Sequence, residues 1–290
     1  MTIVPYTTDS VSVSMGQRYD IVVEADAAAG DYWLRAGWVS ACLNNSHPDD
    51  MTGIIRYDKR STADPTSSSS VTTKATCGDE PYESLVPWLA LDVGRVTNEA
   101  EEVLSFRMDN YFEWTLNDSS LMIDWSSPTL LGVLEGNGVF PTECNILAVD
   151  KTPKSSTDEW AVLVIQDESG YGLYRPIHLH GHDFWIVAQN IGIFDAANPG
   201  FTTTNPPRRD VASVPGNGYL ALAFKLDNPG TWLAHCHIAW HASEGFSLEF
   251  VESESEISAS IRSAARTAVE DICISWDSFN QVYVQDDSGI

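Results

Sequence analysis

The sequence predicts an all-β protein built from Greek-key β-sandwich or barrel domains. Short runs of alternating apolar residues recur along most of the chain, and turn-forming clusters such as DAANPG (195–200) and LDNPG (226–230) separate them. Spacing with a period of two places one set of side chains on one face of a sheet. Many short strands between turn signals are typical of sandwiches and barrels. The 290 residues suffice for two domains or for one large all-β domain.

The expected strands occur in two groups along the chain. Two lie in the first 25 residues, and the others follow residue 100. The apolar residues that define them are Val11/Val13/Met15, Tyr19/Ile21/Val23, Leu104/Phe106/Met108, Trp160/Val162/Val164, Phe184/Ile186/Ala188, Leu220/Leu222/Phe224 and Phe246/Leu248/Phe250.

One short helix is expected near the C-terminus. Apolar residues recur there at helical spacing after the acidic stretch ESESE, which suits a helix N-terminus. They are Ile257, Ile261, Ala265, Ala268 and Ile272. The Ser/Thr-rich stretch 61–77 indicates a surface loop or linker. We therefore expect a partial domain over residues 1–85, a linker over 86–100 and a complete domain over 101–290.

Composition excludes some classes of partner. The net charge of −25 and the pI near 4.3 argue against binding to nucleic acids and to anionic membranes. The acidity also has a simpler explanation, since secreted proteins are often acidic and remain soluble for that reason. No apolar run reaches the roughly 18 residues of a membrane span. Met1 leads directly into TIVPYTTDS without the basic and apolar regions of a signal peptide, which taken alone indicates a cytosolic chain.

Six of the seven histidines fall in two short stretches, GLYRPIHLHGHDF (172–184) and TWLAHCHIAWHASEGF (231–246). On a strand, alternate residues point the same way. His178 and His180 can therefore reach one place, as can His235 and His237. Cys236 must point to the opposite face. These stretches predict a metal site.

Copper explains the pattern better than two alternatives. A thiolate with two imidazoles and a weak or absent axial ligand suits an electron-transfer copper. Structural zinc more often uses four clustered cysteine or histidine ligands. A nucleophilic cysteine beside a base is the third reading, but it leaves the repeated His-x-His pattern unexplained.

The motifs HLHGHDF and HCHIAWHASEGFSLEF together resemble the C-terminal end of a multicopper oxidase, and specifically of an ascomycete-type fungal laccase. The stretches IVPYTTDS, GQRYDIVVEA, NPPRRDV, AFKLDNPGTW and the terminal DSGI agree with it. Laccases have three cupredoxin-like domains. The resemblance implies that residues 1–85 belong to the second domain and 101–290 form the third, while the first domain is absent.

The resemblance implies copper ligands residue by residue. Cys236 and His241 match ligands of the type 1 copper, with Phe246 at its axial position. His178 matches a type 2 ligand, and His180, His235 and His237 match type 3 ligands. Cys236 is covalently bonded between His235 and His237, so these three residues form the implied electron path between the sites. His182 matches no ligand and is interpreted as a supporting or structural residue.

Two departures from the family pattern affect the expected activity. The trinuclear cluster of laccases needs eight histidines, and this chain supplies four. In addition, Arg175 stands where the family has the other type 1 histidine. Arginine has no lone pair to offer a metal, and its fixed charge opposes cation binding.

The cysteines and two glycosylation sequons indicate where in or outside the cell the protein is found. Cys42 and Cys77 resemble an internal disulfide of ascomycete laccases, and Cys273 resembles a cysteine whose partner lies in the missing domain. Cys144 either stays free or pairs with Cys273. Asn44 and Asn117 begin glycosylation sequons. Disulfides indicate a secreted protein, and a truncated chain would reconcile this with the missing signal peptide. The tail DDSGI resembles one that plugs the channel toward the trinuclear site.

Two functions follow from these observations. The first is a fragment of a secreted laccase-like oxidase that oxidises phenolic donors by one electron and reduces oxygen to water, with a missing N-terminal domain as partner. The second is a catalytically inactive cupredoxin-type remnant that binds copper weakly or serves a structural role. Whether this chain alone is an enzyme stays open between them.

Overall fold

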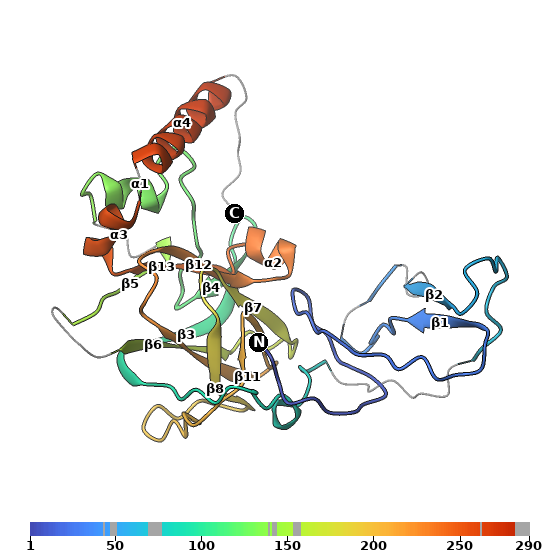
Figure 1. The fold of residues 1–290 in the computed structure, drawn as a ribbon. Helices are drawn as coiled ribbons and strands as arrows, with labels where there is room; N and C mark the ends of the chain where they lie inside the picture. Colours follow the sequence, from blue (N-terminus) through green and yellow to red (C-terminus); the bar gives the residue numbers. More distant parts are fainter. Residues whose placement is uncertain are drawn as a thin grey trace.

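The computed structural model describes residues 1–42, 44–46, 51–68, 77–138, 140, 144–152, 158–261 and 263–281. Two β-sheets, of six and five strands, stack face to face over the C-terminal part (Figure 1). A separate two-stranded sheet pairs β1 (Asp31–Arg35) with β2 (Thr52–Arg56). The all-β sandwich predicted from the sequence is therefore confirmed.

The six-stranded sheet contains most of the strands predicted after residue 100. In spatial order it comprises β4 (Phe112–Leu116), β3 (Arg95–Met108), β6 (Glu159–Asp167), β11 (Gly218–Lys225), β8 (Phe184–Ile191) and β9 (Arg208–Arg209). All neighbours pair antiparallel except β3 and β6, which pair parallel.

The five-stranded sheet carries both histidine stretches at its centre. Its order is β10 (Val211–Val214), β7 (Arg175–Leu179), β12 (Gly230–Cys236), β13 (Ser247–Glu252) and β5 (Ile146–Val149). The pair β13 and β5 is parallel, and the others are antiparallel. Because β7 and β12 are neighbours, sequence motifs that lie more than 50 residues apart meet on adjacent strands.

The main hydrophobic core fills the space between the two sheets. It draws Leu163 from β6, Leu222 from β11, Leu179 from β7 and Phe250 from β13, all at most 1% exposed. A second cluster around Trp160 covers the opposite face of the six-stranded sheet. As a result β6 is buried on both faces along its whole length. The alternation of Trp160, Val162 and Val164 predicted the strand but did not indicate that its other face is buried as well.

Helices cover the outer side of the five-stranded sheet. Leu134 of α1 (Thr129–Leu134) and Ile257 of α3 (Glu254–Ser260) pack against Val251 of β13. The single helix expected near the C-terminus occurs as two, α3 and α4 (Ser263–Asn280), because Ile261 between them is extended. Figure 1 shows α4 beyond α1 and α3. The remaining short elements are α2 (Ala239–Ser243) and a 3-10 turn at Tyr82–Ser84.

The prediction of two strands in the first 25 residues is wrong. Residues 11–15 and 19–23 lie outside any strand, and Val22 is fully exposed. An extended segment becomes a strand only when a neighbour accepts its backbone hydrogen bonds. Within the described residues no strand pairs with either segment, so the apolar alternation produces extended chain without a sheet.

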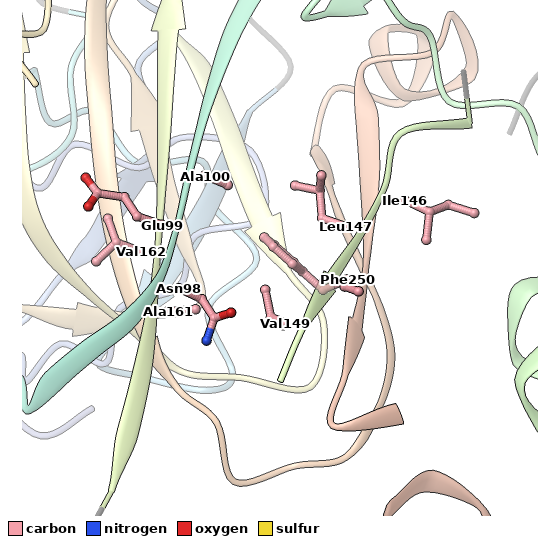
Figure 2. Close-up of a pocket in the computed structure, with 10 residues that line it drawn as sticks. Asn98, Glu99, Ala100, Ile146, Leu147, Val149, Ala161, Val162 and Phe250 are labelled. Atoms are coloured by element: carbon pink, nitrogen blue, oxygen red, sulfur yellow. The ribbon is translucent and has the colours of Figure 1, made fainter. Parts of the chain in front are cut away.

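A groove opens between the edges of the two sheets. It measures about 220 Å³ and lies between β3 and β6 on one side and β5 and β13 on the other (Figure 2). Ala100, Leu147, Val149 and Phe250 make its wall largely apolar, with Asn98 and Glu99 as its polar lining. None of the groove's strands carries a histidine of the two motifs, so the groove is separate from the candidate metal site.

Within the described part of the chain, no helix is long and apolar enough to cross a bilayer.

Glu102 on β3 generates a prediction about stability. Its side chain is 7% exposed, and burial raises its pKa from 4.5 to about 7. The folded state therefore holds this proton more tightly than the unfolded chain, so stability falls as pH rises through that window. We expect Glu102→Gln to raise the free energy of unfolding by about 2 kcal/mol near pH 8 and to change it little near pH 4. Urea unfolding at both pH values measures this.

The exposed neighbour provides the matched control. Glu101→Gln removes the same charge from the solvent side of β3 and should leave stability unchanged at either pH. A Glu102→Gln protein that is no more stable than the parent near pH 8 would contradict the explanation.

Candidate metal centre

The pairing of β7 with β12 places the metal-binding candidates. In this antiparallel register His235 lies opposite His178, and Cys236 lies opposite Ile177. Neighbouring residues on a strand point to opposite faces. His235 and His178 consequently lie on the outer face, whereas Cys236 is fully buried in the core between the sheets. The strand pleat thus divides the predicted residues between two adjoining sites.

The outer site brings together four of the six histidines. The ring centroids of His178 and His180 are 4.7 Å apart, and those of His178 and His235 are 5.7 Å apart. His237 lies 6.0 Å from His178 and 5.9 Å from His235 by the same measure. The Nε2 atoms of His180 and His235 approach to 3.1 Å. We call these four residues the four-histidine cluster.

Backbone carbonyls set the tautomers of two cluster members. Nδ1 of His178 lies 2.7 Å from the Asp210 carbonyl, and Nδ1 of His235 lies 2.8 Å from the Cys236 carbonyl. A carbonyl oxygen only accepts, so each Nδ1 carries the proton. Nε2 then presents its lone pair to the cluster. Metal-binding histidines are typically held through the opposite ring nitrogen in this way.

Burial favours the neutral imidazole at two members of the cluster, His235 and His180, which suits metal binding. It lowers the pKa of His235 to about 4, and it lowers the pKa of His180, where nearby histidines add to the effect. The tautomers of His178 and His235 leave a lone pair on each Nε2, and such donors chemically fit a copper site. Among the described residues, however, no three His, Cys, Asp or Glu side chains are placed to hold a metal ion by themselves. The chain supplies donors without completing a coordination shell.

His182 lies apart from the cluster. Its Nε2 is 2.8 Å from Glu252 on β13, and both side chains are buried. Its ring also contacts Phe224 and Trp232, with centroids 5.0 and 5.9 Å away. The buried pair fastens the turn after β7 to β13. This placement agrees with a supporting role for His182.

The inner site surrounds Cys236. The short helix α2 returns His241 to the cysteine, so that His241 Nδ1 lies 3.5 Å from Cys236 Sγ. Trp114 of β4 lies against His241, with ring centroids 5.0 Å apart. Phe246 is 1% exposed, and its carbonyl accepts a hydrogen bond from the Cys236 backbone. We call Cys236, His241, Phe246, Trp114 and Arg175 the cysteine pocket.

Arg175 fills the remaining side of the cysteine pocket. It is fully buried and forms a salt bridge of 3.2 Å with Asp167, which is equally buried. It also donates to Ser169 Oγ and to the Leu173 carbonyl, and its guanidinium carbon lies 4.6 Å from the centre of the Trp114 ring. Asp167 accepts further hydrogen bonds from Ser169 and Asn217. The arginine is therefore an integrated part of the core.

The cysteine pocket does not fit a copper ion held by one cysteine and two histidines. Among the described residues, one imidazole, that of His241, lies beside Cys236, and the Arg175 guanidinium packs on Trp114 in the same pocket. Burial raises the pKa of Cys236 to about 12 despite the nearby Arg175 charge, so the thiol keeps its proton at neutral pH. Burial, assisted by Arg175, also lowers the pKa of His241 to about 4.

Sequence reasoning missed several supporting residues. Asp167, Trp114 and Glu252 lie on strands that carry none of the motif histidines, and each becomes a neighbour only through sheet pairing and packing. The clearest available signal was Arg175 itself, because a buried arginine in a strand requires a carboxylate partner.

The structure shows where the cysteines and the sequon asparagines lie. The predicted disulfide between Cys42 and Cys77 is present. Cys273 is a buried free thiol on α4, so it is not bonded to Cys144. Asn44 and Asn117 are exposed, but the Asn117 side chain hydrogen-bonds the backbone of Glu101 and Val103. The predicted plug at 286–290 lies outside the described residues.

Comparison with known proteins identifies similar sequences and structures. Residues 1–60 and 122–256 match family models described as Multicopper oxidase. Laccase-2 of Botryotinia fuckeliana is 53% identical over 99% of this chain and 49% of its own length. Laccase-1 of the same fungus is 45% identical, over 99% of this chain and 50% of that protein. The crystal structure of the laccase from Botrytis aclada superposes with a TM-score of 0.91 at 51% identity, covering 99% and 52%. The chain thus spans about half the length of these relatives.

The buried ion pair generates a prediction. Asp167→Asn would leave the Arg175 guanidinium buried without a countercharge, so we expect the free energy of unfolding to fall by ~3–5 kcal/mol. Asp58→Asn is the control, because its salt bridge with Arg60 lies on the surface and should be worth nothing measurable. Chemical denaturation of both variants measures the difference. Equal stability of Asp167→Asn and the parent would show that the pair does not hold the pocket.

Proposed function

Because the chain belongs to the multicopper oxidase family, whose cofactor is copper, we propose that it forms the C-terminal part of a secreted laccase-like oxidase. The reaction proposed for the whole protein is one-electron oxidation of phenolic donors coupled to reduction of oxygen to water. Residues 1–85 would be part of a second cupredoxin-like domain, 86–100 a linker, and 101–290 the third domain.

The four-histidine cluster is the observation that carries this proposal. His178 would bind the type 2 copper, and His180, His235 and His237 the type 3 pair. The tautomers of His178 and His235 and the lowered pKa of His180 and His235 support metal binding. The incompleteness of the cluster supports a partner segment that supplies further ligands. Since the relatives are about twice as long as this chain, the missing N-terminal half is the natural source of those ligands.

The chain's own residues would hold and orient the metal donors. The Asp210 carbonyl fixes the His178 ring, and the Cys236 carbonyl fixes the His235 ring. Copper, when bound, would supply the redox chemistry with oxygen. Cys236 is bonded through the backbone to both His235 and His237. Because the cysteine pocket does not suit copper, the proposal includes no electron transfer through Cys236.

The salt bridge between Arg175 and Asp167 favours a second candidate function. With this pair in the core, the chain would be a non-catalytic cupredoxin-type domain that binds copper at its histidines or serves a structural role. We propose that this describes the chain when isolated. The oxidase function would then require both the missing half and a type 1 site different from this pocket.

The disulfide between Cys42 and Cys77 supports a secreted location, because cytosolic proteins rarely keep such bonds. Glycosylation at Asn44 and Asn117 would accompany secretion. Phenolic donors and oxygen would be the small-molecule partners, and the net charge argues against nucleic acid.

The absence of type 1 copper chemistry gives the first functional prediction. The purified chain loaded with copper should lack the intense blue thiolate-to-copper band and should not oxidise phenols. Visible absorption and oxygen consumption with a phenolic donor measure both. Such a band in the unmodified chain would refute the role given to Arg175.

A variant with histidine at position 175 is the matched comparison for the missing blue band. Arg175→His returns an imidazole to the pocket beside Cys236 and His241. The double variant Arg175→His/Asp167→Asn also removes the carboxylate left without its partner. A blue band in either variant and none in the parent would identify the arginine as the obstacle.

The four-histidine cluster gives a second functional prediction. His235→Ala should weaken binding of Cu²⁺ to the chain by ~10-fold or more, because it removes a donor that faces His180. His47→Ala changes the one histidine outside the two motifs and should leave the affinity unchanged. Isothermal titration calorimetry compares them. Equal losses from the two substitutions would argue that copper binds elsewhere.

A further inference from the structure

A tight turn from the N-terminal segment lies directly against the four-histidine cluster. The Gln17 backbone N–H donates to the Ser14 carbonyl at 3.0 Å, and Gly16 has φ of +78°. These features define a four-residue turn in which the third position needs a positive φ, as glycine provides. We call residues 14–17 the SMGQ turn.

Gly16 is the point of contact with His237. A Cβ added at Gly16 would lie 2.4 Å from Cδ2 and 2.7 Å from Nε2 of the His237 ring. The glycine backbone is therefore in close van der Waals contact with the imidazole. Any side chain at position 16 would have to displace that ring or the turn.

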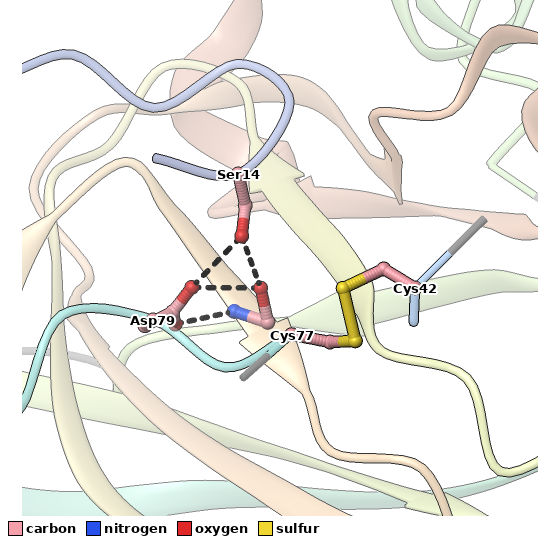
Figure 3. The surroundings of a disulfide bond; sticks show 5 residues. Ser14, Cys42, Cys77 and Asp79 are labelled. Carbon is pink, nitrogen blue, oxygen red and sulfur yellow. Dashed lines mark hydrogen bonds between the residues drawn. A yellow bond between two sulfur atoms is a disulfide. The ribbon is translucent and has the colours of Figure 1, made fainter. Parts of the chain in front are cut away.

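Buried hydrogen bonds fix the SMGQ turn to the five-stranded sheet. Gln17 is 6% exposed and donates to the Asp79 carboxylate at 2.6 Å and to the Val211 carbonyl at 3.3 Å. Asp79 also accepts from the Ser14 hydroxyl and from the backbone and hydroxyl of Ser213 on β10. Figure 3 shows this carboxylate two residues after Cys77, beside the disulfide to Cys42.

The same attachment reaches His178 through β10. Val211 pairs with His178 in the sheet, and the preceding Asp210 carbonyl holds the His178 ring. Arg18 adds a salt bridge to the Asp210 side chain, but Arg18 is 70% exposed and this bond contributes little. The buried bonds of Gln17 and Asp79 are the main link.

We propose that the SMGQ turn is a positioning element for the copper ligands. It sets the His237 ring through Gly16 and supports the strand that orients His178. The turn lies in the segment assigned to the second domain, so that segment would shape a site whose four ligands from this chain lie in the third. This inference deepens the proposed function and rests on it for the identity of the metal.

The sharpest test compares two glycines with the same backbone conformation. Gly16→Ala adds a methyl group against His237, whereas Gly136→Ala adds one at φ of +77° with nothing within 4 Å. Both carry the same backbone strain, and only the first meets a ligand. Gln17→Ala is a third variant, which removes the buried hydrogen bonds without adding bulk.

Two readouts are taken on the full chain. Gly16→Ala should shift the imidazole nitrogen resonances of His237 in the metal-free protein and weaken Cu²⁺ binding ~10-fold or more. Gly136→Ala should change neither, and Gln17→Ala should give intermediate changes in both. The inference would be overturned if the imidazole nitrogen resonances of His237 did not shift in Gly16→Ala. It would also be overturned if the two glycine variants changed these resonances and the Cu²⁺ affinity equally.

The metal-free measurement separates this inference from the proposed function. If the parent chain fails to bind Cu²⁺, the proposed copper site is wrong. A His237 shift confined to Gly16→Ala and Gln17→Ala would still establish that the turn positions the ring.

Discussion

The antiparallel register of β7 and β12 is the constraint on which the rest of the site depends. By setting His235 opposite His178 it gathers imidazoles on the outer face of the sheet, and by the same pleat it buries Cys236 between the sheets. A slip of one residue would reverse both faces. The close packing of both sheets around the core makes such a slip costly. The two adjoining sites are thus consequences of one strand pairing.

Arg175 shows how a charged side chain can be buried beside Cys236 without a gap in the core. A neutral imidazole would carry no charge to balance the Asp167 carboxylate, whereas the guanidinium pairs with it and packs on Trp114. The core remains filled and its charge compensated, which is the condition for tolerating buried ions. The four-histidine cluster lies on the other face and keeps its geometry. A cysteine pocket filled by an arginine and a cluster of four histidines on the other face are therefore compatible within one chain.

Much of this organisation could be predicted from the sequence because it is local. Alternation located the strands after residue 100, and i, i+2 spacing placed His235 and His237 apart from Cys236. Other features depend on contacts distant in sequence. The segments around Val13 and Ile21 have strand patterns but no strand partner, and no spacing rule brings Gly16 to His237 or Asp167 to Arg175. Those neighbours are set by sheet order and by how the N-terminal segment packs, which composition does not encode.

We infer that any copper held by this chain binds to its histidines and not to its cysteine. X-ray absorption at the copper edge of the copper-loaded chain tests this most directly, because it identifies the atoms bonded to the metal. We expect nitrogen and oxygen neighbours with the scattering pattern of imidazole and no sulfur at bonding distance. A short copper–sulfur distance in the unmodified protein would contradict it.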